Sequence, residues 1–331
     1  MAKRKSSELD LSPSILHERL MRRTPAMTYA GGDVVAWQRK LRRRVKQRLG
    51  WDQFAHGKDR VALRPRTLWH RENALGTIEK IAFTAEPGSD VVGYWCVPRE
   101  PIAPATTFIC VQGHSSGMHN SIAVSDEDEV TPKKVEGDRD FGLGCLRRGI
   151  AALCIEQRAF GQRRETRQRI GNPGGKTTCY EASMHALQMG RTMIGERVYD
   201  VDRAIDYLKQ RGDVDMKRIG LMGNSGGGTT SLFGAAVLRR IAFAMPSCYF
   251  CTFADSIMSI HHCLDNYAPG LLLDAEMYDV AGLIAPRPVV MVSGKTDDIF
   301  PIAAARKAFR KLKAIYAAAD AGDRCKHVVG P

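Results

Sequence analysis

The chain has 331 residues, of which 44% are hydrophobic and 26% charged, so it suits one large α/β domain with an appendage, or two domains. No apolar run reaches the ~18 residues of a membrane-spanning helix, and no apolar segment of the secretory type follows the basic residues at the start. The nine cysteines lie mostly in apolar stretches, which is typical of buried thiols in a reducing compartment. We therefore expect a cytoplasmic protein without membrane attachment.

The formal net charge of +13 is concentrated at the start of the chain, where residues 1–60 contain 15 Lys and Arg against 6 Asp and Glu. Such a segment can bind nucleic acid or another acidic partner. Over residues 34–49, however, apolar residues recur at helical spacing with basic residues between them. We interpret this stretch as an amphipathic helix that packs on the body of the protein, and we expect no nucleic-acid partner.

The predicted elements divide the chain into two units. Residues 1–75 form an N-terminal basic helical extension that ends in an irregular arm over 57–75. Residues 76–331 contain strand-like apolar runs with helical patterns between them. The predicted strands are residues 77–84, 91–97, 106–111, 149–155, 219–222, 241–246, 289–292 and 324–329. The predicted helices are residues 141–148, 197–211, 228–238 and 302–319.

Strands and helices alternate through most of the second unit, which predicts an α/β protein with a mostly parallel, eight-stranded sheet flanked by helices. The first two strands are joined by a short turn and fit an antiparallel hairpin at the sheet edge. Residues 164–195 have a weak pattern and several Gly and Pro residues. We therefore expect a long irregular segment that can cover a site.

The sequence Gly-Asn-Ser-Gly-Gly at 223–227 follows a predicted strand and precedes a predicted helix. A serine on such a sharp turn requires Gly two positions before and after it, because side chains there would collide. Gly223 and Gly227 fill these positions around Ser225. The N–H of Gly226, at the start of the helix, can bind an oxyanion. We therefore predict that Ser225 is a nucleophile rather than a solvent serine in a glycine-rich turn.

The loop at 112–117, after the third predicted strand, is where a second oxyanion donor is expected in this arrangement. Gly113 lets the backbone turn, and we predict that the N–H of His114 is the donor. His114 as a catalytic base is the alternative, but its loop is not the one that normally supplies the base.

A carboxylate that orients a catalytic histidine is expected two strands beyond the serine, after the predicted strand at 289–292. Asp297 and Asp298 both lie there. We favour Asp297 as the acid, because it comes three residues after a Gly turn. We interpret Asp298 as the cap of the helix that follows.

Thiol and imidazole groups follow the sixth predicted strand, at Cys248, Cys251, His262 and Cys263. They could ligate zinc or form a redox pair. The group lacks the spacing of a zinc finger and the sequence context of a thioredoxin-like site. We therefore expect no metal and no other cofactor.

Six segments carry a family resemblance: QGHSSG (112–117), EQRAFGQR (156–163), GNSGGG (223–228), HCLDNYAPGLL (262–272), IAPRPVVMVSGKTDDIFP (284–301) and CKHVVGP (325–331). Together they resemble the acetyl xylan esterase and dienelactone hydrolase-like group of the α/β-hydrolase superfamily. The resemblance implies an α/β-hydrolase fold and metal-free ester hydrolysis by a Ser-Asp-His triad. It implies Ser225 as nucleophile, Asp297 as acid, and the N–H groups of His114 and Gly226 as oxyanion donors.

The chain departs from the family pattern in three places. Glu156 stands where relatives usually have Asp, and Ala159 where they usually have Gly. The family's histidine follows the eighth strand, typically in Gly-Gly-His, and this sequence stops at Pro331, so we expect a catalytic unit truncated before that loop. His327 lies within the strand and His262 after the sixth strand, so both are less suited to act as the base.

These observations predict a serine carboxylesterase that acts on a small-molecule substrate, a short-acyl or acetyl ester such as an acetylated carbohydrate. A peptidase or thioesterase on the same fold is one alternative. A non-catalytic scaffold is the other, if the chain naturally ends at Pro331. The sequence leaves the oligomeric state open.

Overall fold

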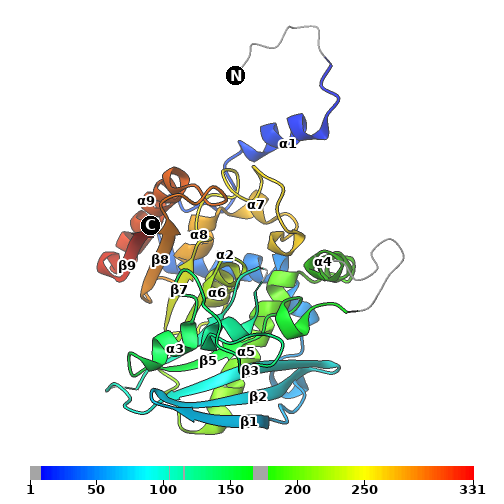
Figure 1. Ribbon diagram of the computed structural model, residues 1–331. Helices are drawn as coiled ribbons and strands as arrows, with labels where there is room; N and C mark the ends of the chain where they lie inside the picture. The colour runs from blue at the N-terminus through cyan, green and yellow to red at the C-terminus, as the bar shows by residue number, and fades with distance from the viewer. Residues whose placement is uncertain (1–8, 104, 115, 167–177) are drawn as a thin grey trace.

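The computed structural model of the chain describes residues 9–103, 105–114, 116–166 and 178–331. A nine-stranded sheet runs through the molecule (Figure 1). Its strands, in spatial order, are β1 (Arg66–Asn73), β2 (Gly76–Glu86), β3 (Ser89–Pro98), β5 (Ala151–Ile155), β4 (Thr107–Val111), β6 (Ile219–Asn224), β7 (Phe243–Ser247), β8 (Val289–Gly294) and β9 (Cys325–Gly330). Strands β4 to β9 are mutually parallel, and β1, β2 and β3 form an antiparallel edge. The predicted α/β fold with a mostly parallel sheet is therefore confirmed.

The helices lie around this sheet, and several short 3₁₀ turns connect the elements. The α-helices are α1 (Pro13–Met21), α2 (Val34–Arg48), α3 (Phe141–Leu146), α4 (Thr178–Gln188), α5 (Met193–Arg211), α6 (Gly226–Val237), α7 (Leu271–Asp274), α8 (Met277–Gly282) and α9 (Ile302–Ala318). The 3₁₀ turns are η1 (Trp51–Gln53), η2 (Gly57–Asp59), η3 (Met118–Ile122), η4 (Gly161–Arg163), η5 (Leu264–Asn266) and η6 (Gly322–Arg324).

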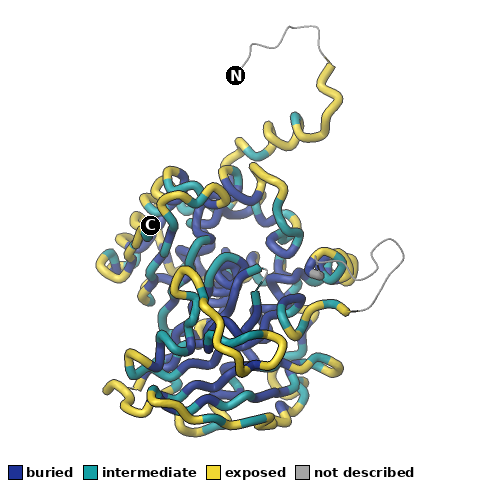
Figure 2. Tube along the Cα trace, viewed as in Figure 1, coloured by how far each residue is buried: buried dark blue, intermediate teal, exposed yellow. Residues whose placement is uncertain are grey.

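Apolar side chains pack on both faces of the sheet. Because successive residues of a strand point to opposite faces, Ile109 and Leu153 belong to the large core cluster, whereas Cys110 and Cys154 belong to a smaller one. Helices α2, α5, α6 and α8 contribute to the large cluster and α3 to the smaller one. Figure 2 shows this interior in dark blue. The core thus fixes the central strands from both sides, and with them the loops at their carboxyl ends.

The sheet has one strand more than the eight that the sequence predicts. The additional strand, β1, lies within the predicted irregular arm over 57–75 and pairs antiparallel with β2. Its side chains are mostly exposed, and Trp69 and Arg71 are half-buried. An edge strand that buries so little has no clear apolar alternation, so the pattern of period two does not reveal it.

Helix α4 lies within residues 164–195, for which the sequence predicts an irregular segment. Cys179, Ser183 and Ala186 form its buried face, whereas Tyr180 and Met184 are exposed. The helical pattern is weak because a polar serine faces inwards and two large apolar side chains face outwards. The prediction of an irregular segment is based on several Gly and Pro residues. These lie outside the described residues: Gly171, Pro173, Gly174 and Gly175.

The predicted amphipathic helix is confirmed as α2, which packs on the body of the protein. Leu41 and Val45 are fully buried in the large core cluster. Arg42 donates hydrogen bonds to the carbonyl oxygens of Ala236 (2.9 Å) and Leu283 (2.6 Å), at the C-terminal ends of α6 and α8. Part of the positive charge near the start of the chain therefore stabilises helix ends. The division of the chain after residue 75 stays a prediction.

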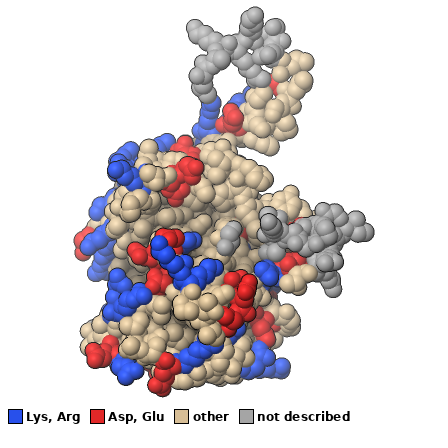
Figure 3. Space-filling view, in the orientation of Figure 1, with Lys and Arg blue, Asp and Glu red and all other residues tan. Residues whose placement is uncertain are grey.

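Helix α1 projects from the body of the molecule, and its residues are exposed or half-buried (Figures 1 and 2). On the face shown in Figure 3, basic and acidic residues are interspersed, so this face has mixed charge rather than one continuous basic surface. None of the helices in the described part of the chain combines the length and the apolar character needed to cross a membrane.

Candidate active site

The predicted nucleophile lies on a sharp turn between β6 and α6. Ser225 has φ 53° and ψ −116°, a strained conformation for a residue with a side chain. A Cβ on Gly223 would lie 2.5 Å from the carbonyl oxygen of Gly227, and a Cβ on Gly227 would overlap the carbonyl oxygen of Val111. Only glycine therefore fits at these two positions, as the Gly-x-Ser-x-Gly pattern predicts. Helix α6 begins at Gly226, so its first N–H groups lie next to the serine.

The loop after β4 lies directly against this turn. A Cβ on Gly113 would be 2.8 Å from the carbonyl oxygen of Asn224 and 3.1 Å from Cβ of Ser225. The imidazole of His114 lies over Gly226, where a Cβ would be 3.0 Å from Nδ1 of the ring. The two predicted oxyanion donors, the N–H groups of His114 and Gly226, thus belong to segments that meet at the serine. Their catalytic role stays a prediction.

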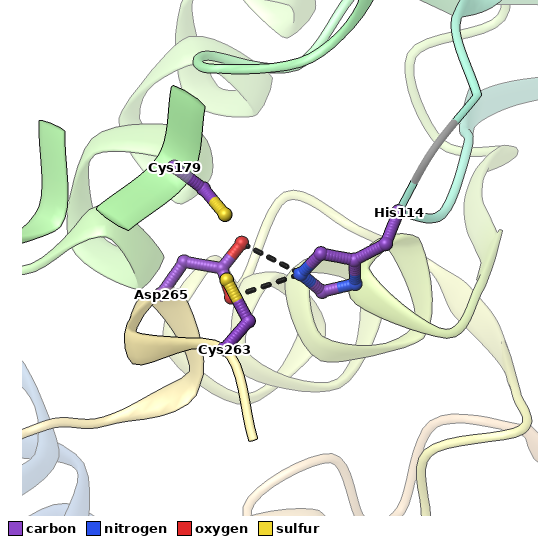
Figure 4. Close-up of side chains that lie close together, drawn as sticks. All are labelled: His114, Cys179, Cys263 and Asp265. Carbon is purple, nitrogen blue, oxygen red and sulfur yellow. Dashed lines mark hydrogen bonds and ion pairs between the residues drawn. The ribbon is translucent and has the colours of Figure 1, made fainter. Parts of the chain in front are cut away.

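A buried carboxylate that the sequence motifs do not single out holds the side chain of His114. Nε2 of His114 lies 3.0 Å from both oxygens of Asp265 (Figure 4). Asp265 also accepts hydrogen bonds from Arg197 (2.7 Å) and from the side-chain amide of Asn266 (2.8 Å). Asp265 and Arg197 are only 1% and 2% exposed. The one sequence signal for this group is that Asp265 lies within the family-like segment 262–272.

These contacts determine the charge of His114. Burial alone would lower its pKa, but hydrogen bonds to Asp265 and Cys263 and the charge of Asp265 outweigh burial and raise the pKa of His114 to about 9. Burial would raise the pKa of Asp265, but the charges of Arg197 and His114 hold it well below its usual range. At pH 7 the ring is therefore an imidazolium paired with a carboxylate. A charged ring cannot accept a proton, which argues against His114 as the base.

A second histidine, His262, lies next to His114. The centroid of its ring is 6.3 Å from that of His114 and 6.0 Å from that of Phe300. Burial lowers the pKa of His262, and the charge of His114 adds to this effect. The neutral ring that a general base requires is therefore the main form at pH 7. The preceding residue, His261, is exposed.

The loop after β8 carries the two candidate acids. Oδ1 of Asp297 accepts hydrogen bonds from the N–H groups of Ile299 (3.0 Å) and Phe300 (2.9 Å). Helix α9 has Pro301 as its N-cap and Asp298 is exposed, so the prediction that Asp298 caps this helix is wrong. The loop turns back on Asp297 because a short carboxylate side chain readily accepts from N–H groups two or three residues ahead. Asp297 is half-buried.

His327 lies within β9, as the sequence predicts. Its Nε2 is 2.9 Å from Oγ of Ser293 in β8. Its ring packs on Phe309 of α9, with a centroid distance of 5.1 Å. The contacts of His327 are therefore made at the edge of the sheet rather than with the turn at Ser225.

The two departures from the family pattern within segment 156–163 are Glu156 and Ala159, and both have specific structural roles. Glu156 is buried, and its carboxylate accepts hydrogen bonds from the N–H groups of Met118 (3.1 Å) and Gln162 (3.1 Å), which joins the loops after β4 and β5. Burial raises the pKa of Glu156 to about 7. Ala159 has φ 67°, in the left-handed region that favours glycine. This conformation is one that the glycine of the family pattern would adopt without strain.

Within the described part of the chain, Cys248 and Cys251 do not join His262 and Cys263 in one group of potential metal ligands. Cys251 contacts the backbone of Pro301, and Cys248 contacts the hydroxyl of Ser247. Cys263 belongs to a group of four side chains whose potential ligand atoms are all within 4.8 Å of one another: His114, Cys179, Cys263 and Asp265 (Figure 4).

The chain is similar to known proteins both in sequence and in structure, although no family model matches it. The chain is 32% identical over 280 residues to the Bacillus subtilis (strain 168) protein named "Putative hydrolase YtaP", which covers 82% of this chain and 86% of that protein. A "putative acetyl xylan esterase" from Bacteroides fragilis NCTC 9343 has a TM-score of 0.78 at 14% identity, covering 98% of this chain and 84% of that chain. A glucuronoyl esterase from Solibacter usitatus has a TM-score of 0.62 at 14% identity, covering 93% of each chain.

At such low identity the two solved structures share the fold of this chain, and a shared fold does not fix the substrate. The similarity to YtaP is closer and extends over most of both chains. It agrees with the strand-turn-helix geometry at Ser225. The chain therefore belongs to the α/β-hydrolase superfamily, and the predictions of this family and of a hydrolytic enzyme are confirmed.

Proposed function

We propose that the protein is a serine esterase that hydrolyses small carboxylic esters through an acyl-enzyme on Ser225. The observation that carries the proposal is the strained conformation of Ser225 between two positions where only glycine fits. Such strain persists only where the surrounding fold imposes it, and it is typical of residues in catalytic turns.

The reaction follows from this geometry. Oγ of Ser225 attacks the ester carbonyl carbon while a base accepts the hydroxyl proton, and the carbonyl oxygen becomes an oxyanion beside the N–H groups of His114 and Gly226. The bond from the carbonyl carbon to the alcohol oxygen then breaks, and the base returns its proton to the leaving alcohol. Water attacks the acyl-enzyme by the same route, releasing the carboxylic acid and the free serine.

The charges around the turn favour different roles for the two neighbouring histidines. A base must be neutral before the reaction, and the lowered pKa of His262 meets this requirement whereas the raised pKa of His114 does not. We propose His262, whose ring centroid lies 6.3 Å from that of His114, as the first histidine to test as the base, and Asp297 as the acid. The imidazolium of His114, beside Gly226, would favour the negatively charged oxyanion.

The substrate class is proposed by analogy with the structural relatives. Their names, acetyl xylan esterase and glucuronoyl esterase, favour an acetylated carbohydrate as the first natural substrate to test. Hydrolysis rates should be compared for 4-nitrophenyl acetate, longer 4-nitrophenyl esters, acetylated xylo-oligosaccharides, acetyl thioesters and peptide amides. The ranking of these rates shows which bond the enzyme prefers to cleave. Faster turnover of thioesters or amides than of acetyl esters would contradict the esterase assignment.

A fluorophosphonate probe tests the nucleophile directly, because it forms a covalent bond with an activated serine. We expect mass spectrometry to find the label on Ser225, and Ser225→Ala to lose both the label and the hydrolysis of 4-nitrophenyl acetate. Ser259→Ala is the control, since Ser259 is exposed. Labelling of another serine while Ser225 stays free would refute the assignment.

A further inference from the structure

Four side chains able to bind a metal converge from three separate segments next to the serine turn. His114 follows β4, Cys179 lies in the first turn of α4, and Cys263 and Asp265 lie at the start of η5. One ligand atom from each residue lies within 4.8 Å of all the others, and the side chains point towards one another (Figure 4). We propose that these four residues bind one zinc-like divalent transition-metal ion as a structural site.

The donor set and its dimensions fit such an ion. Two thiolates, an imidazole and a carboxylate favour zinc or cobalt over magnesium and calcium, which prefer oxygen ligands. Bond lengths of about 2.0–2.3 Å place the ligand atoms of a tetrahedral zinc ion roughly 3.3–3.8 Å apart. The widest pair here would therefore close by about 1–1.5 Å at most, a movement within reach of side-chain rotation.

The charges around the four residues are consistent with a divalent cation. When the ion displaces the protons of His114 and the two thiols, two thiolates and the Asp265 carboxylate carry three negative charges and Arg197 carries one positive charge, so a divalent ion makes this partly buried group neutral. Arg197 and Asn266 already fix the two carboxylate oxygens of Asp265 with hydrogen bonds of 2.7 and 2.8 Å. Partners of this kind orient the ligating carboxylates of metal sites.

The location indicates what the ion would do. Four protein ligands close the coordination shell, which is typical of a structural site. The ion would tie α4 and η5 to the loop that carries His114. Cys179 also packs in a small apolar cluster with Phe160 and Met193, which shields one side of the site from water. With the ion bound, His114 would be a neutral ligand, so the positive charge beside Gly226 would come from the ion instead of an imidazolium. The attack by Ser225 itself requires no metal.

Cobalt provides a direct test with the full chain, kept reduced and freed of metal by a chelator. We expect one equivalent of Co²⁺ to give a thiolate-to-cobalt absorption band and the visible bands of a tetrahedral ion, and one equivalent of Zn²⁺ to abolish them. Cys179→Ser and Cys263→Ser should each bind at least about 100-fold more weakly, since losing only an outer partner already lowers metal affinity about 10–100-fold. Cys248→Ser is the matched control, because its thiol lies outside the group, and it should bind like the parent.

Thermal unfolding gives a second measurement. Zn²⁺ should raise the Tm of the parent and of Cys248→Ser but not that of the two cluster variants, whose metal-free Tm shows whether they fold. The proposal is wrong if the parent gives no thiolate band, or if both cluster variants keep parental affinity. It is also wrong if Cys179 and Cys263 form a disulfide under the reducing conditions of the assay. Fluorophosphonate labelling of Ser225 in the same samples tests the esterase proposal separately.

Discussion

The serine turn and the ionic cluster beside it are built in opposite ways. The turn, residues 223–227, consists of consecutive residues, and its glycines are required by local backbone geometry. The ionic cluster, His114, Arg197 and Asp265, joins three segments that lie far apart in the chain. We therefore expect changes near the turn to act on the chemistry directly, and changes in the ionic cluster to act first on the stability of the fold.

The largest effect is expected for Asp297, the proposed acid in the loop after β8. Asp297→Asn should lower kcat for 4-nitrophenyl acetate by about 10⁴-fold, as loss of the triad acid does in other serine hydrolases. The fold should be little affected, because the asparagine carbonyl can still accept from the N–H groups of Ile299 and Phe300. Asp298→Asn is the matched control at an exposed position, and its kcat should stay close to that of the parent. A larger effect at Asp298 than at Asp297 would reverse the assignment.

The ionic cluster should respond with a loss of stability. Asp265→Asn leaves the buried charge of Arg197 without its partner, so we expect the free energy of unfolding to fall by about 3–5 kcal/mol in urea titrations. The comparison is Asp213→Asn, which removes the carboxylate of a pair with Arg211 whose Asp213 side chain is 51% exposed. Such a surface pair contributes at most about 1 kcal/mol.

Replacing both members of the buried pair tests whether the unpaired charge of Arg197 causes the loss of stability. The double variant Arg197→Met and Asp265→Leu removes the charge together with its partner, so it should recover part of the stability lost in Asp265→Asn. Equal losses for Asp265→Asn and Asp213→Asn would show that the buried pair does not matter to the fold.

The third effect concerns the turn itself. A Cβ on Gly227 would overlap the carbonyl oxygen of Val111, so Gly227→Ala should lower the free energy of unfolding by about 3 kcal/mol. It should also abolish labelling of Ser225. At Gly322 a Cβ would meet no described atom within 4 Å, so Gly322→Ala should change stability by less than about 0.5 kcal/mol. If Gly227→Ala keeps parental activity, the turn does not have the geometry that we describe.

The same contrast explains which parts of the fold could be predicted from the sequence. The central strands are continuous apolar runs, and α2 carries apolar residues at helical spacing, so pattern alone located them. Strand β1 and helix α4 escaped prediction because neither has a clear apolar periodicity in its sequence. The edge strand buries little of its surface, and the helix places Ser183 inside and Met184 outside.

The candidate site divides in the same way. The sharp turn at Ser225 could be predicted because its backbone geometry requires glycine at 223 and 227, and these glycines are visible in the sequence. The partnership of His114 with Asp265 and Arg197 could not, because it depends on where the loop after β4, helix α5 and turn η5 pack against one another. The two members of a buried ion pair have no characteristic spacing in the sequence. Only the tertiary structure shows which partner stabilises a buried charge.

The smallest effect is a pH dependence of stability caused by Glu156. It tests whether the loops after β4 and β5 bury this carboxyl group. Its ordinary pKa, about 4.5, applies in the unfolded chain, and burial raises the pKa to about 7 in the folded protein. The folded state therefore holds the proton more tightly, so this group stabilises the fold most at low pH and that contribution is lost as pH rises from about 4.5 to 7. Between pH 5 and 7 the loss should be about 2 kcal/mol.

Glu156→Gln removes this titration while keeping the hydrogen bonds, because one amide oxygen in the position of Oε2 can accept from both Met118 (3.2 Å) and Gln162 (3.1 Å). Urea titrations of parent and variant at pH 5, 6 and 7 should therefore diverge, with the variant gaining about 2 kcal/mol relative to the parent over this range. The other acids titrate in both proteins, so the difference between the two curves isolates Glu156. A constant difference at all three pH values would mean that Glu156 has an ordinary pKa, and that its loops are not closed over it as the structure indicates.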